Sequence, residues 1–76
     1  MRKLIAIDAR WDEETSAWIA TSRDLPGLVV EAPSWSAMIA ETEHLVPELL
    51  ELAGAQADEV SLTFRAETRR DLARAS

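Results

Sequence analysis

Few residues of this sequence could carry out chemistry. A nuclease that works through two Mg²⁺ ions needs carboxylates from several structural elements close together, and Asp8 and Glu41 could supply two of them. The segment that could supply a third offers Glu59 and, beyond it, Ser61, Thr63 and Arg65. This set of ligands is incomplete, so solvated positions for Asp8 and Glu41 are the simpler interpretation.

The other kinds of catalysis lack their residues. His44 is the only histidine, and a lone imidazole is more often a surface residue than a general base or metal ligand. The absence of cysteine excludes disulfides, thiolate catalysis and Cys-ligated zinc. No serine has a readable base and acid beside it, and two glycines cannot form a Gly-rich phosphate loop. We therefore expect a non-enzyme without a metal site or cofactor.

The first elements that position these residues are two strands. Residues alternate between Lys3 and Trp11, with Ile5 and Ile7 on one face and Asp8 and Arg10 on the other. The polar residues 12–16 predict a hairpin loop. Residues 17–21 predict the returning strand, in which Trp18 can lie near Trp11.

A forced turn follows at Leu25-Pro26-Gly27-Leu28. Proline presets φ at the second position, and glycine accepts the positive φ that a type II turn requires at the third. A third strand over residues 28–32 then leaves the turn, and Pro33 stops it.

One long helix is predicted after Ser34, whose hydroxyl can cap it, and before Gly54, which ends it. Pro47 lies inside this helix, on the side away from the apolar stripe, and we favour one bent helix over two separate ones. The stripe that should face a sheet comprises Trp35, Met38, Ile39, Leu45, Val46, Leu49, Leu50 and Ala53, with Thr42 filling the gap.

A loop at residues 55–58 leads to a fourth strand over 59–65, in which Val60, Leu62 and Phe64 should face inward. The predicted fold class is α+β, with the order β-β-β-α-β. A three-stranded antiparallel meander precedes the crossover helix. A right-handed crossover that places the fourth strand beside the first strand gives the sheet order 3-2-1-4. One face of this sheet would lack a cover. We expect a domain at residues 1–66 and an Arg-containing tail at 67–76, whose arginines are Arg69, Arg70 and Arg74.

Length and charge limit the function. A chain of 76 residues makes a thin core, so self-association or a partner is expected, as a homodimer or higher homo-oligomer. A formal charge of −6 disfavours broad nucleic-acid binding and suits a basic partner, although many ordinary soluble domains are equally acidic. Neither a signal peptide nor a membrane-spanning stretch is present, so we expect a cytoplasmic protein.

The hairpin ARWDEETSAWIATSRDLPGLVVEA, with its Asp-Leu-Pro-Gly turn, and the helix ending LVPELLELAG resemble the short, single-domain branch of the HicB-like antitoxin family. The resemblance spans about residues 5–64. It implies a partial ribonuclease-H-like or double-stranded-RNA-binding-like fold. Many members of the family carry a DNA-binding module after this domain, and no such module fits in this chain, so direct nucleic-acid binding is not expected.

The resemblance also implies a function in a toxin–antitoxin system, as a domain that binds and neutralises a HicA-like toxin, a small basic ribonuclease that cleaves mRNA. The antitoxin would cover the toxin's RNA-binding and active surface. The candidate toxin-binding residues are Glu13, Glu14, Asp24, Leu25, Pro26 and Gly27. The acidic helix row Glu41, His44, Glu48 and Glu51 could instead dock on a basic partner, or could be an ordinary solvated face.

Two alternatives remain at this point. One is a stand-alone homo-oligomeric domain with no toxin partner, in which self-association consumes the open sheet face. The other is a residual nuclease that uses Asp8 and Glu41.

Overall fold

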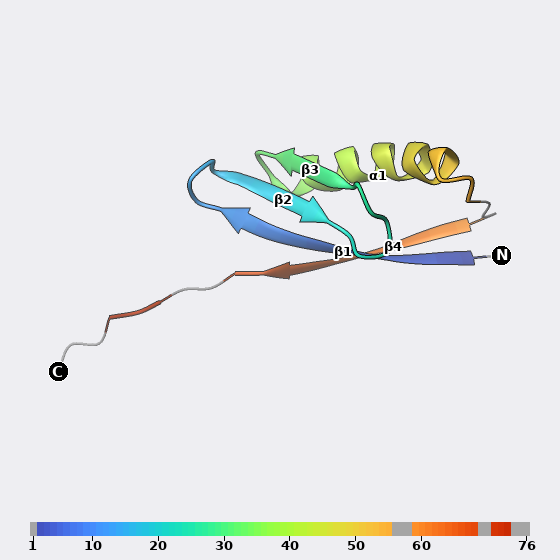
Figure 1. The fold of residues 1–76 in the computed structure, drawn as a ribbon. Coiled ribbons are helices and arrows are strands. Elements are labelled where there is room, and N and C mark those ends of the chain that lie inside the picture. The colour runs from blue at the N-terminus through green and yellow to red at the C-terminus, as the bar shows by residue number, and fades with distance from the viewer. Residues whose placement is uncertain (1, 56–58, 69–70, 74–76) are drawn as a thin grey trace.

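The computed structural model describes residues 2–55, 59–68 and 71–73 and contains a four-stranded sheet with one helix on one of its faces (Figure 1). The elements follow the order β-β-β-α-β, and the sheet order is β3-β2-β1-β4. Both predictions are confirmed. The strands are β1 (Arg2–Asp12), β2 (Ala17–Thr21), β3 (Val29–Ala32) and β4 (Glu59–Glu67), and the helix is α1 (Trp35–Leu52).

Strand β1 is the centre of the sheet. It pairs antiparallel with β2 over residues 8–12 and parallel with β4 over residues 2–10. Trp11 lies directly opposite Trp18 with the ring centroids 5.7 Å apart in an edge-to-face arrangement, so the hairpin carries the expected aromatic pair. The last residue of β1 stabilises the loop, because the Asp12 carboxylate accepts hydrogen bonds from the Glu14 amide and the Thr15 hydroxyl.

The predicted turn after β2 is confirmed. The Leu28 amide donates to the Leu25 carbonyl at 3.2 Å, and Gly27 has φ of +94°. These are the hydrogen bond and the positive φ that a type II turn requires. The chain reverses there and runs back as β3, antiparallel to β2.

Helix α1 begins and ends as the sequence predicts. The Ser34 hydroxyl caps the helix by accepting from the Ala37 amide at 3.1 Å. At the other end Gly54 takes φ of +72°, and its amide and that of Ala55 bond back to carbonyls of the last turn, which is a Schellman motif. The helix continues through Pro47 as one element, which confirms the single-helix interpretation.

The core lies between α1 and the sheet. The helix contributes four buried residues, Met38, Thr42, Val46 and Leu50. The buried residues of the strands and the turn that pack with them include Ile5, Ile7, Ala20, Leu25, Leu28 and Val30. The Thr42 hydroxyl is satisfied because it donates to the Met38 carbonyl at 2.8 Å.

Of the predicted inward positions, Ala53 is wrong, and Val60 faces the helix side as predicted but is only partly buried. Ala53 was placed on the apolar stripe but is exposed, because the helix ends one residue earlier and Ala53 is its C-cap. Val60 was expected to face inward, and it does lie on the helix side of β4, but 38% of its surface remains accessible. The cause is the position of α1, which packs over β2 and β3 and leaves β4 only partly covered.

The predicted boundary between a domain at 1–66 and a tail at 67–76 stays a prediction, and β4 itself runs to Glu67. Arg69, Arg70 and Arg74 of the predicted tail lie outside the described residues, as does most of the predicted loop 55–58. Within the described chain, no helix has the length and apolar character needed to cross a membrane.

Candidate functional site

The turn after β2 is attached to the middle of the sheet by two side chains. Strand β2 pairs with β1 only as far as Asp8, so the backbone of Ala6 has no strand beside it on that edge. The Asp24 carboxylate accepts from the Ala6 amide at 2.8 Å, and the Ser22 hydroxyl donates to the Ala6 carbonyl at 2.7 Å. The Asp24 amide in turn donates to the Ser22 hydroxyl at 3.1 Å. These side chains replace the missing rung of the ladder and fix the turn against β1.

The four turn residues predicted to bind a toxin have different surroundings. Leu25 is only 4% exposed and belongs to the core, so its direct role is to anchor the turn. Pro26 and Gly27 are exposed at the tip. Asp24 is exposed as well and lines a hollow on the sheet face that α1 does not cover.

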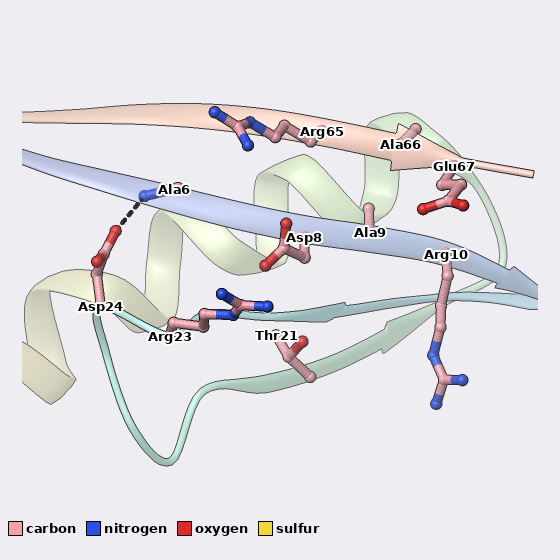
Figure 2. A pocket seen from close by; sticks show the side chains of 10 residues that line it. All are labelled: Ala6, Asp8, Ala9, Arg10, Thr21, Arg23, Asp24, Arg65, Ala66 and Glu67. Carbon is pink, nitrogen blue, oxygen red and sulfur yellow. Dashed lines mark hydrogen bonds between the residues drawn. The ribbon is translucent and has the colours of Figure 1, made fainter.

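That hollow has a volume of about 770 Å³, and six of its ten lining residues are charged (Figure 2). We call this side of the sheet the open face. The charged residues that line the hollow are three carboxylates and three arginines, namely Asp8, Asp24, Glu67, Arg10, Arg23 and Arg65. Their equal numbers make the hollow balanced in charge, whereas the whole chain carries −6.

The charges at the centre of the open face alternate in sign in both directions. Asp8 is the register partner of Arg65, and Arg10 is the register partner of Glu67, so each cross-strand pair joins opposite charges. The sign of the charge also changes along each strand, from Asp8 to Arg10 on β1 and from Arg65 to Glu67 on β4. Among the described residues, no hydrogen bond or ion pair joins these four side chains, or that of Arg23, to another group. They are therefore available to the charges of a bound partner.

The hairpin end of the open face carries Glu13. A second hollow, of about 340 Å³, is lined there by Arg10, Trp11, Glu13, Glu67 and Thr68. Arg10 and Glu67 line both hollows, so Glu13 and Asp24 border one continuous surface although they lie at opposite ends of β2. Glu14 is exposed at the hairpin tip and lines neither hollow.

The two candidate nuclease carboxylates are not brought together. Asp8 lies on the open face, whereas Glu41 is exposed on α1, which covers the opposite face. No group of three or more His, Cys, Asp or Glu side chains among the described residues could hold a metal ion. The lone histidine, His44, lies 3.8 Å from the Glu48 carboxylate one turn away on the exposed helix surface. The geometry thus gives the nuclease alternative no support.

Sequence reasoning did not single out Arg10, Arg23 or Glu67 as site residues. The alternation in β1 placed Arg10 on the face opposite Ile5 and Ile7, and this was the available signal. The position of Glu67 beside Arg10 depends on the parallel register of β1 and β4, which a single sequence does not reveal.

The chain belongs to the family described as a domain of unknown function, DUF1902, whose family model matches residues 4–74. A crystal structure of a hypothetical protein from the extremely thermophilic bacterium Thermus thermophilus has the same fold, with a TM-score of 0.80 and 35% sequence identity. That likeness covers 92% of this chain and 100% of the other. No curated protein matches the sequence.

Proposed function

We propose that this protein is an antitoxin-like binding domain that neutralises a small basic HicA-like ribonuclease by covering its RNA-binding and active surface. The observation that supports the proposal is the open face. It exposes a continuous charged surface on which Asp8, Arg10, Arg23, Arg65 and Glu67 have no partner within the described chain.

The charge pattern favours a protein over a nucleic acid. Phosphate binding over a broad surface needs clustered Lys and Arg, but each arginine in the central hollow is matched by a carboxylate. Alternating signs instead give a partner protein both attractive contacts and a defined orientation. The net charge of −6 would attract a basic protein from a distance and raise its association rate.

The HicB-like resemblance supplies the type of partner. The motif of that resemblance is the Asp-Leu-Pro-Gly turn, which the Asp24 carboxylate attaches to the Ala6 amide. The turn therefore forms one border of the open face. Glu13 lies at the other border, at the hairpin end. A basic ribonuclease seated between them would have its RNA-binding surface occupied and would be unable to bind mRNA.

Co-expression with the HicA-like protein encoded by a neighbouring gene tests this proposal. The wild-type chain should relieve the growth arrest that the toxin causes and should form a complex with it on gel filtration. The double variant Asp8→Lys, Glu67→Lys should lose both activities, because replacing two carboxylates with two ammonium groups makes the open face repel a basic partner.

The matched control is Glu41→Lys, Glu51→Lys, which makes the same change in net charge on the exposed surface of α1, away from the open face. This control should retain rescue and complex formation. If the control loses binding and the open-face variant keeps it, the acidic helix row is the binding surface. Absence of both rescue and complex with the wild-type chain would reject the proposal.

The second candidate function is a stand-alone homo-oligomeric domain without a toxin. The observation that favours it is the exposed apolar side of β4, where Val60 is 38% accessible and Leu62 and Phe64 are half-buried. A neighbouring gene that encodes no short basic protein with a single histidine would favour this candidate.

A further inference from the structure

Strand β4 is the outermost strand of the sheet and runs for nine residues. Among the residues that the structure describes, it pairs with β1 and no strand lies at its outer edge. Natural sheets protect long edges with proline, bulges, short strands or charged side chains. Of these, β4 has only the charged side chains Glu59, Arg65 and Glu67, and it pairs with β1 without interruption from residue 59 to residue 67. The other edge of the sheet, β3, has four residues and is followed directly by Pro33. The edge at β4 is therefore the one that can accept another strand.

An apolar groove lies beside this edge on the helix side of the sheet. It has a volume of about 350 Å³ and is bordered by α1 and β4. The groove is lined by Ile39, Glu43, Val46, Pro47, Val60, Leu62 and Phe64. Because α1 packs over β2 and β3, the inward side chains of β4 are only partly covered: Val60 is 38% accessible, and Leu62 and Phe64 are half-buried. A strand added at the edge would cover these side chains from the other side.

We propose that a second copy of this chain occupies the edge, with the two β4 strands antiparallel and Leu62 opposite Leu62 across a twofold axis perpendicular to the sheet. In this register Glu59 faces Arg65 of the second copy, and Val60 faces Phe64. Opposite charges meet on the open face and apolar side chains meet on the helix side, each pair occurring twice by symmetry. The result is one continuous eight-stranded sheet with both helices on the same side.

The sequence of β4 selects this register over its neighbours. In an antiparallel pair, the side chains of two opposed residues lie on the same face of the sheet. The nearest alternative registers therefore place the twofold axis at Thr63 or at Ser61. An axis at Thr63 places Glu59 opposite Glu67 of the second copy, which sets like charges against each other twice. An axis at Ser61 places Glu59 opposite Thr63 and loses its contact with Arg65. Only the axis at Leu62 pairs both charges with their opposites.

This inference does not rest on toxin binding. The dimer uses the strand edge, the apolar groove and, on the open face, Glu59 and Arg65, and it makes no use of Asp8, Arg10, Arg23 or Asp24. Arg65 lies on β4 and also lines the open-face hollow, so a change at this residue could affect both dimerisation and toxin binding. Dimerisation is therefore measured on the protein alone, without a toxin.

Cysteine cross-linking tests the register directly, because the natural chain contains no cysteine. Oxidation of Leu62→Cys should give a disulfide-linked dimer, since the axis places the two thiols opposite each other. The matched controls Ser61→Cys and Thr63→Cys should cross-link much less. Preferential cross-linking at Ser61 or Thr63 would contradict the proposed register.

A charge swap provides a second test that leaves the apolar residues intact. Sedimentation equilibrium should show that the wild-type chain dimerises. Glu59→Arg or Arg65→Glu alone should weaken dimerisation by about 10-fold, because two symmetry-related pairs become like-charged together. Each single variant also changes a contact within the chain: Glu59→Arg removes the ion pair with Arg2 at 3.1 Å, and Arg65→Glu sets a like charge beside its register partner Asp8. Thermal unfolding of both variants therefore accompanies the dimerisation measurement.

The double variant Glu59→Arg, Arg65→Glu should restore much of the affinity, because each pair again joins opposite charges. A wild-type monomer at all concentrations, or a dimer that neither single variant weakens, would overturn the proposal.

Discussion

The Asp24 carboxylate accepts a hydrogen bond from the backbone amide of Ala6 at 2.8 Å, across 18 positions of sequence. This bond joins the Asp-Leu-Pro-Gly turn to the central strand β1 at the point where β2 has ended. An aspartate that looks like a simple turn residue in the sequence therefore completes the sheet and shapes the open face.

Replacing Asp24 should weaken the fold at this junction. Asp24→Ala removes the acceptor for the Ala6 amide, and we expect it to lower the free energy of unfolding by about 1 kcal/mol. Asp24→Asn keeps an acceptor oxygen and should cost less. Urea denaturation followed by tryptophan fluorescence measures both. Equal stability of Asp24→Ala and the wild type would show that water replaces the carboxylate without cost.

Gly27 should be sensitive for a different reason. A Cβ atom at this position would meet no heavy atom within 4 Å, so space does not limit substitution. The backbone does, because φ is +94°, a conformation that disfavours L side chains. We expect Gly27→Ala to destabilise the fold by about 1 kcal/mol. Pro26→Ala, at the exposed neighbouring position, is the control, and a larger loss from the control would contradict this explanation.

The tryptophans form a chain of edge-to-face contacts that links the hairpin, the helix and β4. Trp18 and Trp35 have ring centroids 5.0 Å apart, and Trp35 and Phe64 are 6.3 Å apart. Trp35→Leu should lower the free energy of unfolding by about 1–3 kcal/mol through lost aromatic contacts and packing. Trp11→Leu should cost less, because Trp18 is the one ring that Trp11 contacts among the described residues. Thermal unfolding of the two variants distinguishes them, and the reverse order would contradict this explanation.

Salt should weaken the proposed complex with the toxin. The open face uses exposed charges, and interactions between exposed charges are screened at high ionic strength. Raising the salt concentration should therefore slow association, as measured by surface plasmon resonance. Arg23→Glu adds two units of negative charge and should speed association with a basic toxin while removing a specific contact. An association rate that does not depend on salt would show that charge does not guide binding.

The sequence predicted the elements of the fold because their signals are local. The turn at Pro26 and Gly27, the cap at Ser34 and the helix end at Gly54 are each specified by a few neighbouring residues, and all three are confirmed. The sheet order followed from the handedness of the crossover, which depends on element order and not on residue detail.

The features that could not be predicted depend on long-range placement. The burial of Leu25 and the bond from Asp24 to Ala6 require the turn to fold back against β1. The exposure of Val60 depends on which strands α1 covers. The pairing of opposite charges on β1 and β4 depends on a parallel register that no local pattern specifies.

Nuclear magnetic resonance mapping during titration with the HicA-like toxin tests the central claim most directly. We predict that the largest chemical-shift changes fall on the open face, at Asp8, Arg10, Arg23 and Asp24, and at Glu13 of the hairpin. The outer surface of α1, including Glu41 and Glu51, should change little. Changes confined to that helix surface, or a titration that shows no binding, would contradict the claim that the uncovered side of the sheet is the binding site.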